Sequence, residues 1–358
     1  MKEVQEYLDL LTERFKLINP NEYYLSYSGG KDSHLLYWFI KEYAKIDGIE
    51  IVGVDTFMEH DEILNRIKKN SDVVLKPDLT PFEIKERYGI PCFTKWQDNI
   101  IYQYQKGSRA PSIMRAITGK GTTKFRLNKQ AKKLTLQNKL HKISAKCDLY
   151  NKKKPIAKYE KQTGRKAIIG IRGDESISRK NLYKDCITKQ GRFVPIYDLT
   201  NDMQQAIYDK YNIEIPNIYN YLDRTGCMGC PYGIHAKTTY RELALLPVDK
   251  RQMVIELFKE SYDILGFDYN NIQPIENYKD CYNPIRCKQC GKLFDIGRDT
   301  LGLYCSRRCQ HNSMKKDKQQ SICLVCNKPF IPHHYSKGLC CSRKCGAIYR
   351  HNIPSLVK

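Results

Sequence analysis

Six residues near the N-terminus have the types and order of a phosphate-binding loop: Ser28, Gly29, Gly30, Lys31, Asp32 and Ser33. They follow the apolar-aromatic run Tyr23–Tyr27 and precede a helical pattern over residues 34–43. Glycines let backbone N–H groups approach a phosphate chain, and a helix N-terminus adds the positive end of its dipole. The spacing is not that of a Walker loop. The pattern predicts a nucleotide site with Lys31 as its mobile charge, and an ordinary Gly-Gly turn is the alternative.

Cysteines in the C-terminal part form a tandem repeat with the spacing of metal ligands. Each cysteine of a first set recurs 36 positions later (287 and 323, for example). Four thiolates complete a tetrahedral zinc site, and such small folds depend on their metal. We expect zinc ribbons at 283–313 and 319–352, with disulfides as the alternative. The predicted ligands are Cys287, Cys290, Cys305 and Cys309 in the first ribbon, and Cys323, Cys326, Cys341 and Cys345 in the second.

The elements that must position the loop follow an alternating strand and helix pattern. Apolar runs that predict strands lie at Tyr23–Tyr27, Ile49–Asp55, Val73–Leu75 and Ala167–Ile171, and a first helix over residues 1–17 ends at Asn19-Pro20. Strands that alternate with helices indicate an α/β fold with a doubly wound parallel sheet. Ligands bind at the carboxyl ends of such strands. The glycine-rich loop, Asp55 and Arg172 all fall at these ends.

A basic segment interrupts this pattern between the third and fourth predicted strands. No Asp or Glu occurs from residue 106 to residue 146, where Lys and Arg recur throughout. We expect a basic helical insertion at about 100–146, within a larger domain spanning 1–275. The whole chain carries a formal net charge of +22. This balance predicts a polyanionic partner and phosphate-backbone contact by the insertion, with a mobile basic segment as the alternative.

The pattern of apolar residues and the number of cysteines are both consistent with a reducing, cytoplasmic compartment. Residues 1–15 are amphipathic and charged, and no run approaches the roughly 18 apolar residues of a membrane span. We therefore expect a cytoplasmic protein without membrane association. Fifteen cysteines in a reducing compartment are more often metal ligands than disulfide partners.

Four ordered signatures over roughly residues 20–270 resemble those of a known family. They are the loop at 28–33, Asp55-Thr56, the Gly-Ile-Arg-x-x-Glu-Ser segment at 170–176 and Gly226-Cys227-x-x-Cys230-Pro231. The chain resembles the PP-loop ATP pyrophosphatases of the phosphoadenosine-phosphosulfate (PAPS) reductase family, which implies an adenine nucleotide alpha hydrolase-like fold. Reductases of this family have a degenerate loop and a C-terminal Glu-Cys-Gly-Leu-His motif. The intact loop here, and a C-terminus without that motif, are more similar to ATP-using members that serve sulfate activation, DNA phosphorothioation or tRNA thiolation.

The cysteines outside the ribbons favour thiolation within that family. Cys227 and Cys230 have the spacing of metal or iron–sulfur ligands. Cys147 matches the position at which iron–sulfur members carry an upstream cysteine, and Cys186 lies between that position and the Cys-x-x-Cys pair. These four residues would suit a [4Fe-4S] cluster near the nucleotide. A structural zinc is the alternative for the set, and an inert buried thiol is the alternative for Cys186.

The resemblance also implies roles for the remaining site residues. ATP would bind to the loop with Mg²⁺ held by Asp32 or Asp55, and Lys31 would offset charge on the leaving pyrophosphate. Arg172 and Arg179 would contact phosphate or sulfate oxygens, while Glu175 would orient an arginine or loop amide or act as a base. The cluster would deliver sulfur to an adenylated nucleic acid, DNA or tRNA, with a cysteine desulfurase as the implied sulfur donor.

Two other functions remain open on the sequence. One is a PAPS reductase or sulfate-activating enzyme that acts on small sulfonucleotides, which would not need the basic insertion or the ribbons. The other is a non-catalytic nucleic-acid-binding protein that keeps the ATP fold as a switch. Pyrophosphate release from ATP separates all three readings.

Overall fold

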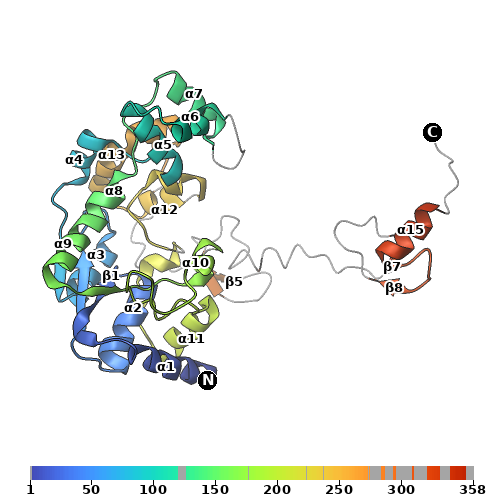
Figure 1. The fold of residues 1–358 in the computed structure, drawn as a ribbon, viewed down its shortest axis with the longest axis horizontal. Coiled ribbons are helices and arrows are strands. Elements are labelled where there is room, and N and C mark those ends of the chain that lie inside the picture. Colours follow the sequence, from blue (N-terminus) through green and yellow to red (C-terminus); the bar gives the residue numbers. More distant parts are fainter. Residues whose placement is uncertain are drawn as a thin grey trace. The chain divides into compact units, whose positions relative to one another are not determined.

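The computed structural model describes residues 2–119, 126–175, 177–222, 224–236, 238–272 and 274, and in the C-terminal part residues 284–286, 293–295, 309, 321–330 and 339–351 (Figure 1). The chain forms two compact units, Met1–Tyr282 and Asn283–Lys358. In the described part of the chain, no helix combines the length and the apolar character needed to cross a bilayer.

A four-stranded sheet lies at the centre of the N-terminal unit, with the strand order β3-β2-β1-β4. All three pairings are parallel, and the strands are β1 (Tyr23–Tyr27), β2 (Glu50–Val54), β3 (Val73–Leu75) and β4 (Lys166–Ile168). The chain moves outward from β1 to β3 and then returns to add β4 on the other side of β1. The predicted parallel sheet is confirmed, and the order reverses beside β1, where open α/β sheets bind their ligands.

Helices cover both faces of this sheet because its strands alternate their side chains between two cores. Leu25 and Ile51 face a large cluster with helices α1 (Lys2–Phe15), α2 (Lys31–Trp38), α3 (Asp61–Asn70) and α11 (Asn201–Tyr211). Tyr24 and Val52 face the opposite side, where the ring of Tyr24 packs 5.0 Å from that of Tyr159 on α9 (Lys154–Thr163). The fold is therefore a doubly wound α/β domain.

The described residues of the basic segment lie in a helical subdomain, within the connection from β3 to β4. Its helices are α4 (Pro81–Tyr88), α5 (Lys95–Gln105), α6 (Pro111–Thr118) and α7 (Lys129–Leu136). Apolar residues such as Ile101, Ile117 and Ile143 form a separate core within it. The chain then returns toward the sheet through α8 (Lys146–Asp148) and the π-helical turn η3 (Leu149–Lys153). The basic residues thus surround a small core of their own.

The other helical elements of this unit are short, apart from one long helix near its end. The long helix α13 (Val248–Leu265) packs with α12 (Thr238–Ala244) in a cluster that includes Met58 and Met228. The short elements are η1 (Pro20–Glu22), η2 (Phe39–Tyr43), η4 (Gly173–Glu175), α10 (Ile177–Leu182), η5 (Asn217–Asn220) and η6 (Pro231–Ala236).

The C-terminal unit carries the same small hairpin in each half of its sequence repeat. Strands β5 (Pro284–Arg286) and β6 (Leu293–Asp295) pair antiparallel, and β7 (Ser321–Ile322) and β8 (Pro329–Phe330) pair in the same way. Helix α15 (Arg343–His351) follows the second hairpin. Cys287, Cys290 and Cys305 lie outside the described residues, so the first predicted zinc site is described only at Cys309.

Candidate nucleotide site and metal centres

The glycine-rich loop is a tight turn whose geometry requires its first glycine. Gly29 has a φ of 71°, and a Cβ there would lie 3.0 Å from the Ile63 carbonyl oxygen. The hydroxyl of Ser33 donates to the carbonyl oxygen of Gly30 at 3.0 Å and accepts from the Ser28 amide at 3.2 Å. Helix α2 begins directly at Lys31 with Gly30 as its N-cap. The loop therefore presents backbone amides and a helix N-terminus, as a phosphate site requires.

Tyrosines hold Lys31 at the start of α2. Its ammonium lies 4.5 Å from the ring centroid of Tyr219, and its backbone N–H donates to the hydroxyl of the same tyrosine at 3.3 Å. The hydroxyl of Tyr208 donates to the Lys31 carbonyl oxygen at 2.8 Å. Lys31 is thus supported beside the loop by aromatic contacts from later in the chain.

Asp32 and Arg172 lie together, as their places at the strand ends imply. The Arg172 Nε donates to Asp32 Oδ1 at 2.6 Å, and the Gln204 amide donates to the same oxygen at 2.8 Å. Arg172 is only 7% exposed and also donates to Asn201 Oδ1 at 3.0 Å. A Cβ on Gly170 would lie 2.9 Å from the carbonyl carbon of Asp32, so the chain after β4 packs directly on the loop. Asp32 therefore anchors Arg172 to the loop.

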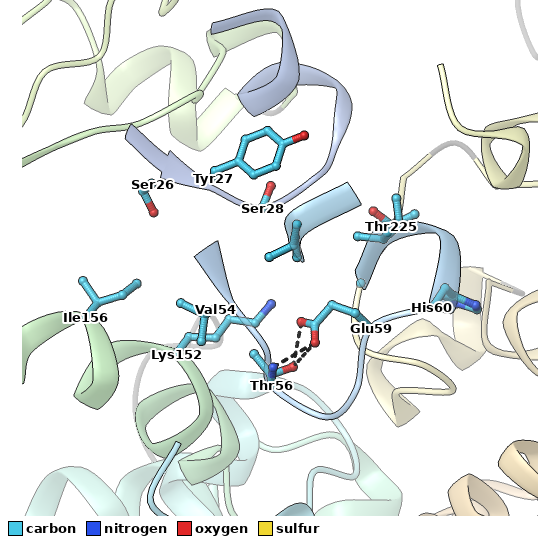
Figure 2. Close-up of a pocket in the computed structure, with 13 residues that line it drawn as sticks. Ser26, Tyr27, Ser28, Val54, Thr56, Glu59, His60, Lys152, Ile156 and Thr225 are labelled. Carbon is cyan, nitrogen blue, oxygen red and sulfur yellow. Dashed lines mark hydrogen bonds between the residues drawn. The ribbon is translucent and has the colours of Figure 1, made fainter. Parts of the chain in front are cut away.

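A cavity of about 140 Å³ lies at the carboxyl ends of β1 and β2, and Figure 2 shows the residues that line it. Ser28 and Thr56 line it from the two strand ends, and the apolar side chains of Val54 and Ile156 line it beside them. Thr225 and Gly226 complete the wall from the segment before the cysteine pair. Small-molecule sites commonly measure about 300–1,000 Å³, so a cavity of this size would enclose only part of a ligand as large as a nucleotide. Asp55 follows β2, is 6% exposed and accepts the Phe57 N–H at 3.1 Å.

Two charged residues of this cavity, Glu59 and Lys152, carried no signal in the sequence. Thr56 donates to Glu59 through both its backbone N–H, at 3.0 Å, and its hydroxyl, at 2.6 Å. Lys152, from η3, points its amine toward this pair (Figure 2). The negative charge of Cys227, and after it that of Glu59, raises the pKa of Lys152 against the opposing effect of burial. Lys152 therefore lines this cavity and lies close enough to Cys227 for their charges to interact.

Three of the four cysteines predicted as cluster ligands lie around one apolar pocket. Cys147, Cys227 and Cys230 line a cavity of about 40 Å³ with residues such as Met58 and Leu257. Burial, followed by the charge of Cys227, raises the pKa of Cys147 to about 12, and the same two causes raise the pKa of Cys230. Burial also raises the pKa of Cys227. Bound metal would stabilise these thiolates in an apolar site that otherwise disfavours them.

Cys186 lies in a different environment from these three cysteines. It packs against the large core of the sheet, and after burial its pKa responds mainly to Arg14 and Asp198. Its carbonyl oxygen accepts the Val194 N–H at 2.6 Å, which ties this segment to the edge of the sheet next to β4. The expected four-cysteine set is therefore not brought together, because backbone pairing holds Cys186 beside Arg14.

The Cys-x-x-Cys loop is also held by contacts that the sequence did not predict. Gly229, between the two cysteines, has a φ of 61°; its N–H donates to Glu242 at 3.0 Å, and its carbonyl accepts from Tyr262. Burial raises the pKa of Glu242 to about 8. The Met228 N–H donates to the Met58 carbonyl at 2.8 Å, which joins this loop to the segment after β2. Hydrogen bonds to Glu242, Tyr262 and Met58 thus hold the cysteine loop in place.

The two remaining predicted residues follow β4. Arg179 lies in α10, is partly buried and lines neither of the two cavities above. Glu175 ends the short helix η4, and its side chain lies outside the described part of the structure.

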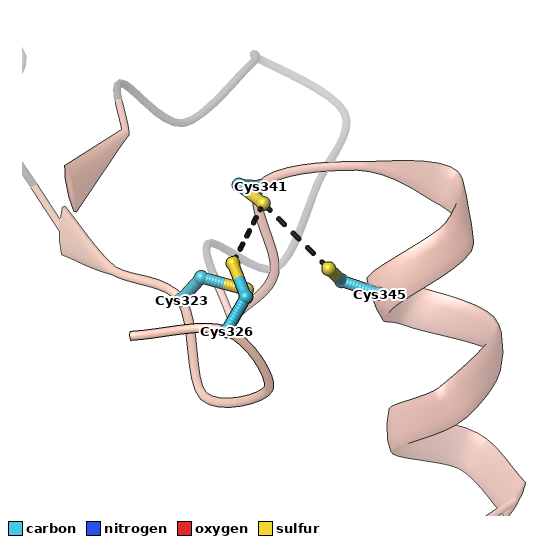
Figure 3. Close-up of side chains that lie close together, drawn as sticks. All are labelled: Cys323, Cys326, Cys341 and Cys345. Carbon is cyan, nitrogen blue, oxygen red and sulfur yellow. Dashed lines mark hydrogen bonds between the residues drawn. The ribbon is translucent and has the colours of Figure 1, made fainter. Parts of the chain in front are cut away.

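Four cysteines of the second repeat converge on one point in the C-terminal unit (Figure 3). The Sγ atoms of Cys323, Cys326, Cys341 and Cys345 all lie within 4.8 Å of one another, and no other group of His, Cys, Asp or Glu in the described ranges meets that condition. The sulfur of Cys341 is 3.4 Å from that of Cys326 and 3.7 Å from that of Cys345. Zn–S bonds of about 2.3 Å in a tetrahedron place sulfurs about 3.8 Å apart. The four residues fit a single zinc ion.

Comparisons with known proteins leave the family of this chain unassigned. No protein-family model and no curated protein matches it. Among solved structures, it is similar to a phosphoadenylyl-sulfate (PAPS) reductase from Candida auris, at 12% identity and a TM-score of 0.30, covering 60% of this chain and 91% of the other. An NH3-dependent NAD synthetase from Campylobacter jejuni is 15% identical at a TM-score of 0.31, covering 73% and 94%. A tRNA thiolase, NcsA, from Methanococcus maripaludis with its [4Fe-4S] cluster is 14% identical at 0.32, covering 85% and 87%. Likenesses this weak carry no argument, and the fold assignment rests on the strand order itself.

Proposed function

We propose that the protein is an ATP-dependent PP-loop enzyme that adenylates nucleic acid, releases pyrophosphate and transfers sulfur with the help of an iron–sulfur cluster. One observation carries this proposal: consecutive residues of the chain line the cavity beside the glycine-rich loop, where we place the nucleotide, and the cysteine pocket. Thr225 and Gly226 line the first cavity, and Cys227, the next residue, lines the second. Lys152 lines the first cavity, and its charge interacts with that of a Cys227 thiolate in the second. Activation at one cavity and sulfur chemistry at the other would then occur side by side.

The loop residues would bind the triphosphate in the first step. A substrate oxygen attacks the α-phosphorus, the bond to the bridging oxygen of the β-phosphate breaks, and pyrophosphate leaves. Lys31 offsets the charge that develops on pyrophosphate, and the backbone amides of 28–33 hold its oxygens. Because Asp32 is already paired with Arg172 and Gln204, Asp55 is the better residue for Mg²⁺ of the two predicted.

The three pocket cysteines would hold the cluster. Their sulfurs are not all within 4.8 Å of one another, so they do not meet the spacing of about 3.8 Å that a single zinc ion requires, and the cluster is the alternative that we favour. Bound there, such a cluster would supply the sulfur for the transfer, in which AMP is the leaving group. Lys152 would stabilise negative charge between that sulfur and the phosphate. A cysteine desulfurase would supply sulfur, and the C-terminal cysteines would bind zinc.

Pyrophosphate release from ATP tests this function. Anaerobically purified protein should release pyrophosphate in the presence of DNA or tRNA, and Lys31→Ala should lower the rate by about 100-fold or more. Lys16→Ala removes an equally positive side chain that is paired with Glu13 on the surface, and it should have no effect. Stimulation by sulfate in place of nucleic acid would support the small-substrate alternative. Release under none of these conditions would contradict the enzymatic proposal.

A further inference from the structure

An open groove of about 530 Å³ lies on the surface of the N-terminal unit, between α5 and the segment 146–153. We refer to it as the α5 groove. Helix α5 contributes Lys95, Trp96 and Tyr102, and the facing segment contributes Lys146, Asp148 and Lys153. Residues 95, 99 and 102 are spaced for one face of a helix, which explains why they line the groove together.

Residues of the segment 146–153 line three different cavities. Lys146, Asp148 and Lys153 line the α5 groove, Cys147 and Asn151 line the cysteine pocket, and Lys152 lines the nucleotide cavity. Consecutive side chains point in different directions because this stretch is a short α-helix that runs into a π-helical turn. Such turns occur often at functional sites. A molecule in the α5 groove would therefore lie against the short helical segment that carries Cys147.

The α5 groove combines aromatic rings with positive charge. Trp96 is 38% exposed, and the Tyr102 ring has the Lys146 ammonium 5.3 Å from its centroid. Nearby, Tyr150 stacks on Tyr88 with ring centroids 4.4 Å apart. Proteins that bind single-stranded nucleic acids use the same combination, with rings that stack on bases and cations that contact phosphates.

A carboxylate organises the lysines of the groove. Asp148 Oδ2 pairs with Lys95 at 2.8 Å and with Lys153 at 2.9 Å, while both lysines remain more than half exposed. One negative charge thus holds two cations at the rim, and the groove as lined by these residues stays positive. The flanking segment 106–146, which has no acidic residue, extends this positive character.

We infer that the α5 groove binds an unpaired stretch of nucleic acid, which brings a target nucleotide beside the cysteine pocket. This inference rests on the proposed function and names the form of its substrate. Stacking needs exposed base faces, which a duplex does not offer, so the groove distinguishes single strands from double helices. An acidic protein segment would match the lysines, but it would leave Trp96 and Tyr102 without a role.

Binding of labelled oligonucleotides to the full-length protein tests the inference. The probes are a fluorescein-labelled single strand of roughly 15 nucleotides, as DNA and as RNA, and the duplex of the same sequence, all followed by fluorescence anisotropy. We expect at least one single strand to bind about tenfold or more tightly than the duplex. Trp96→Ala should weaken that binding about tenfold, and Trp96→Phe should retain most of it because it keeps an aromatic face.

Two further variants distinguish binding in the α5 groove from binding elsewhere on the protein surface. Phe82→Ala removes an aromatic side chain that is also 38% exposed but lies outside the groove lining, and it should bind as the wild type does. Lys146→Ala should reduce the slope of log K against log salt by about 0.7 to 1. Equal affinity for duplex and single strand would overturn the inference, and so would a Trp96→Ala variant with unchanged affinity.

A measurement of ATP binding without nucleic acid tests the two proposals separately. Wild type and Trp96→Ala should bind ATP equally, as measured by calorimetry, because neither Ser28–Ser33 nor Thr56 lines the groove. If ATP binds but neither single strand does, the groove inference is overturned and the nucleotide site stands. If the wild type does not bind ATP, the proposed function itself is overturned.

Discussion

At the residue scale, Lys152 links the two halves of the candidate site. A thiolate at Cys227 is the main cause that raises its pKa above the ordinary lysine value, so Lys152 stays protonated through the neutral range. Replacing it by methionine removes the charge and keeps most of the volume. We expect Lys152→Met to lower sulfur transfer about 100-fold while ATP binding falls much less. Sulfur incorporated into nucleic acid, measured by mass spectrometry, and calorimetry with ATP on the same preparation would measure both effects, and equal losses in the two would contradict this role.

Cysteine replacement tests the three-ligand pocket at the same scale. Cys147→Ser, Cys227→Ser and Cys230→Ser should each reduce bound iron and sulfide in anaerobically purified protein to a small fraction of the wild-type amount. Cys186→Ser is the matched control, since this thiol lies beside Arg14 and not at the pocket. Its iron content should equal that of the wild type. Iron loss in Cys186→Ser as severe as in Cys227→Ser would show that the pocket has a fourth ligand.

At the element scale, close backbone packing positions the glycine-rich loop. A Cβ on Gly170 would lie 2.9 Å from the Asp32 carbonyl carbon, and backbone cannot move aside as a flexible side chain does. We expect Gly170→Ala to weaken ATP binding at least tenfold while the circular dichroism spectrum is retained. Gly346→Ala in α15 is the control, because a Cβ there meets nothing within 4 Å. Undiminished ATP binding by Gly170→Ala would mean that β4 does not hold the loop.

Buried histidines make the stability of these elements depend on pH. Burial lowers the pKa of His34 to about 3, and those of His60 and His141 to about 4. Because these folded-state values lie below the unfolded value, the unfolded chain binds protons first, and stability falls as pH drops from about 6.5 toward 4. Each histidine contributes a slope of up to about 1.4 kcal/mol per pH unit. Urea unfolding at pH 7 and pH 5 should show a smaller loss for His141→Gln than for the wild type.

Sequence patterns predicted the strands and the loop because those features depend on neighbouring residues. The run before Ser28 and the run before Asp55 are β1 and β2, and the parallel sheet follows from their alternation with helices. Lys152 and Glu242 were missed because contacts between distant segments give them their neighbours. Cys186 was grouped with the cluster ligands by its place in the chain, and spacing alone could not reveal that its segment pairs along the sheet edge.

At the scale of the whole molecule, two units carry separate candidate metal sites. The cysteines of the second repeat meet the spacing of a single zinc ion, and those of the N-terminal unit do not. We expect elemental analysis to find zinc that is lost in Cys326→Ser while iron is unchanged, and iron that is lost in Cys227→Ser while zinc is unchanged. Simultaneous loss of both metals in either variant would contradict independent sites.

The central claim is that ATP activation and sulfur delivery are separate steps at adjoining cavities. The most direct test measures, in one reaction with ATP, a sulfur donor and nucleic acid, both the pyrophosphate released and the sulfur incorporated, the latter by mass spectrometry of nucleosides and nucleotides. We predict that Lys31→Ala loses both products, whereas Cys227→Ser still releases pyrophosphate but incorporates no sulfur. Undiminished sulfur incorporation by Cys227→Ser, or the absence of both products with the wild type, would contradict the account.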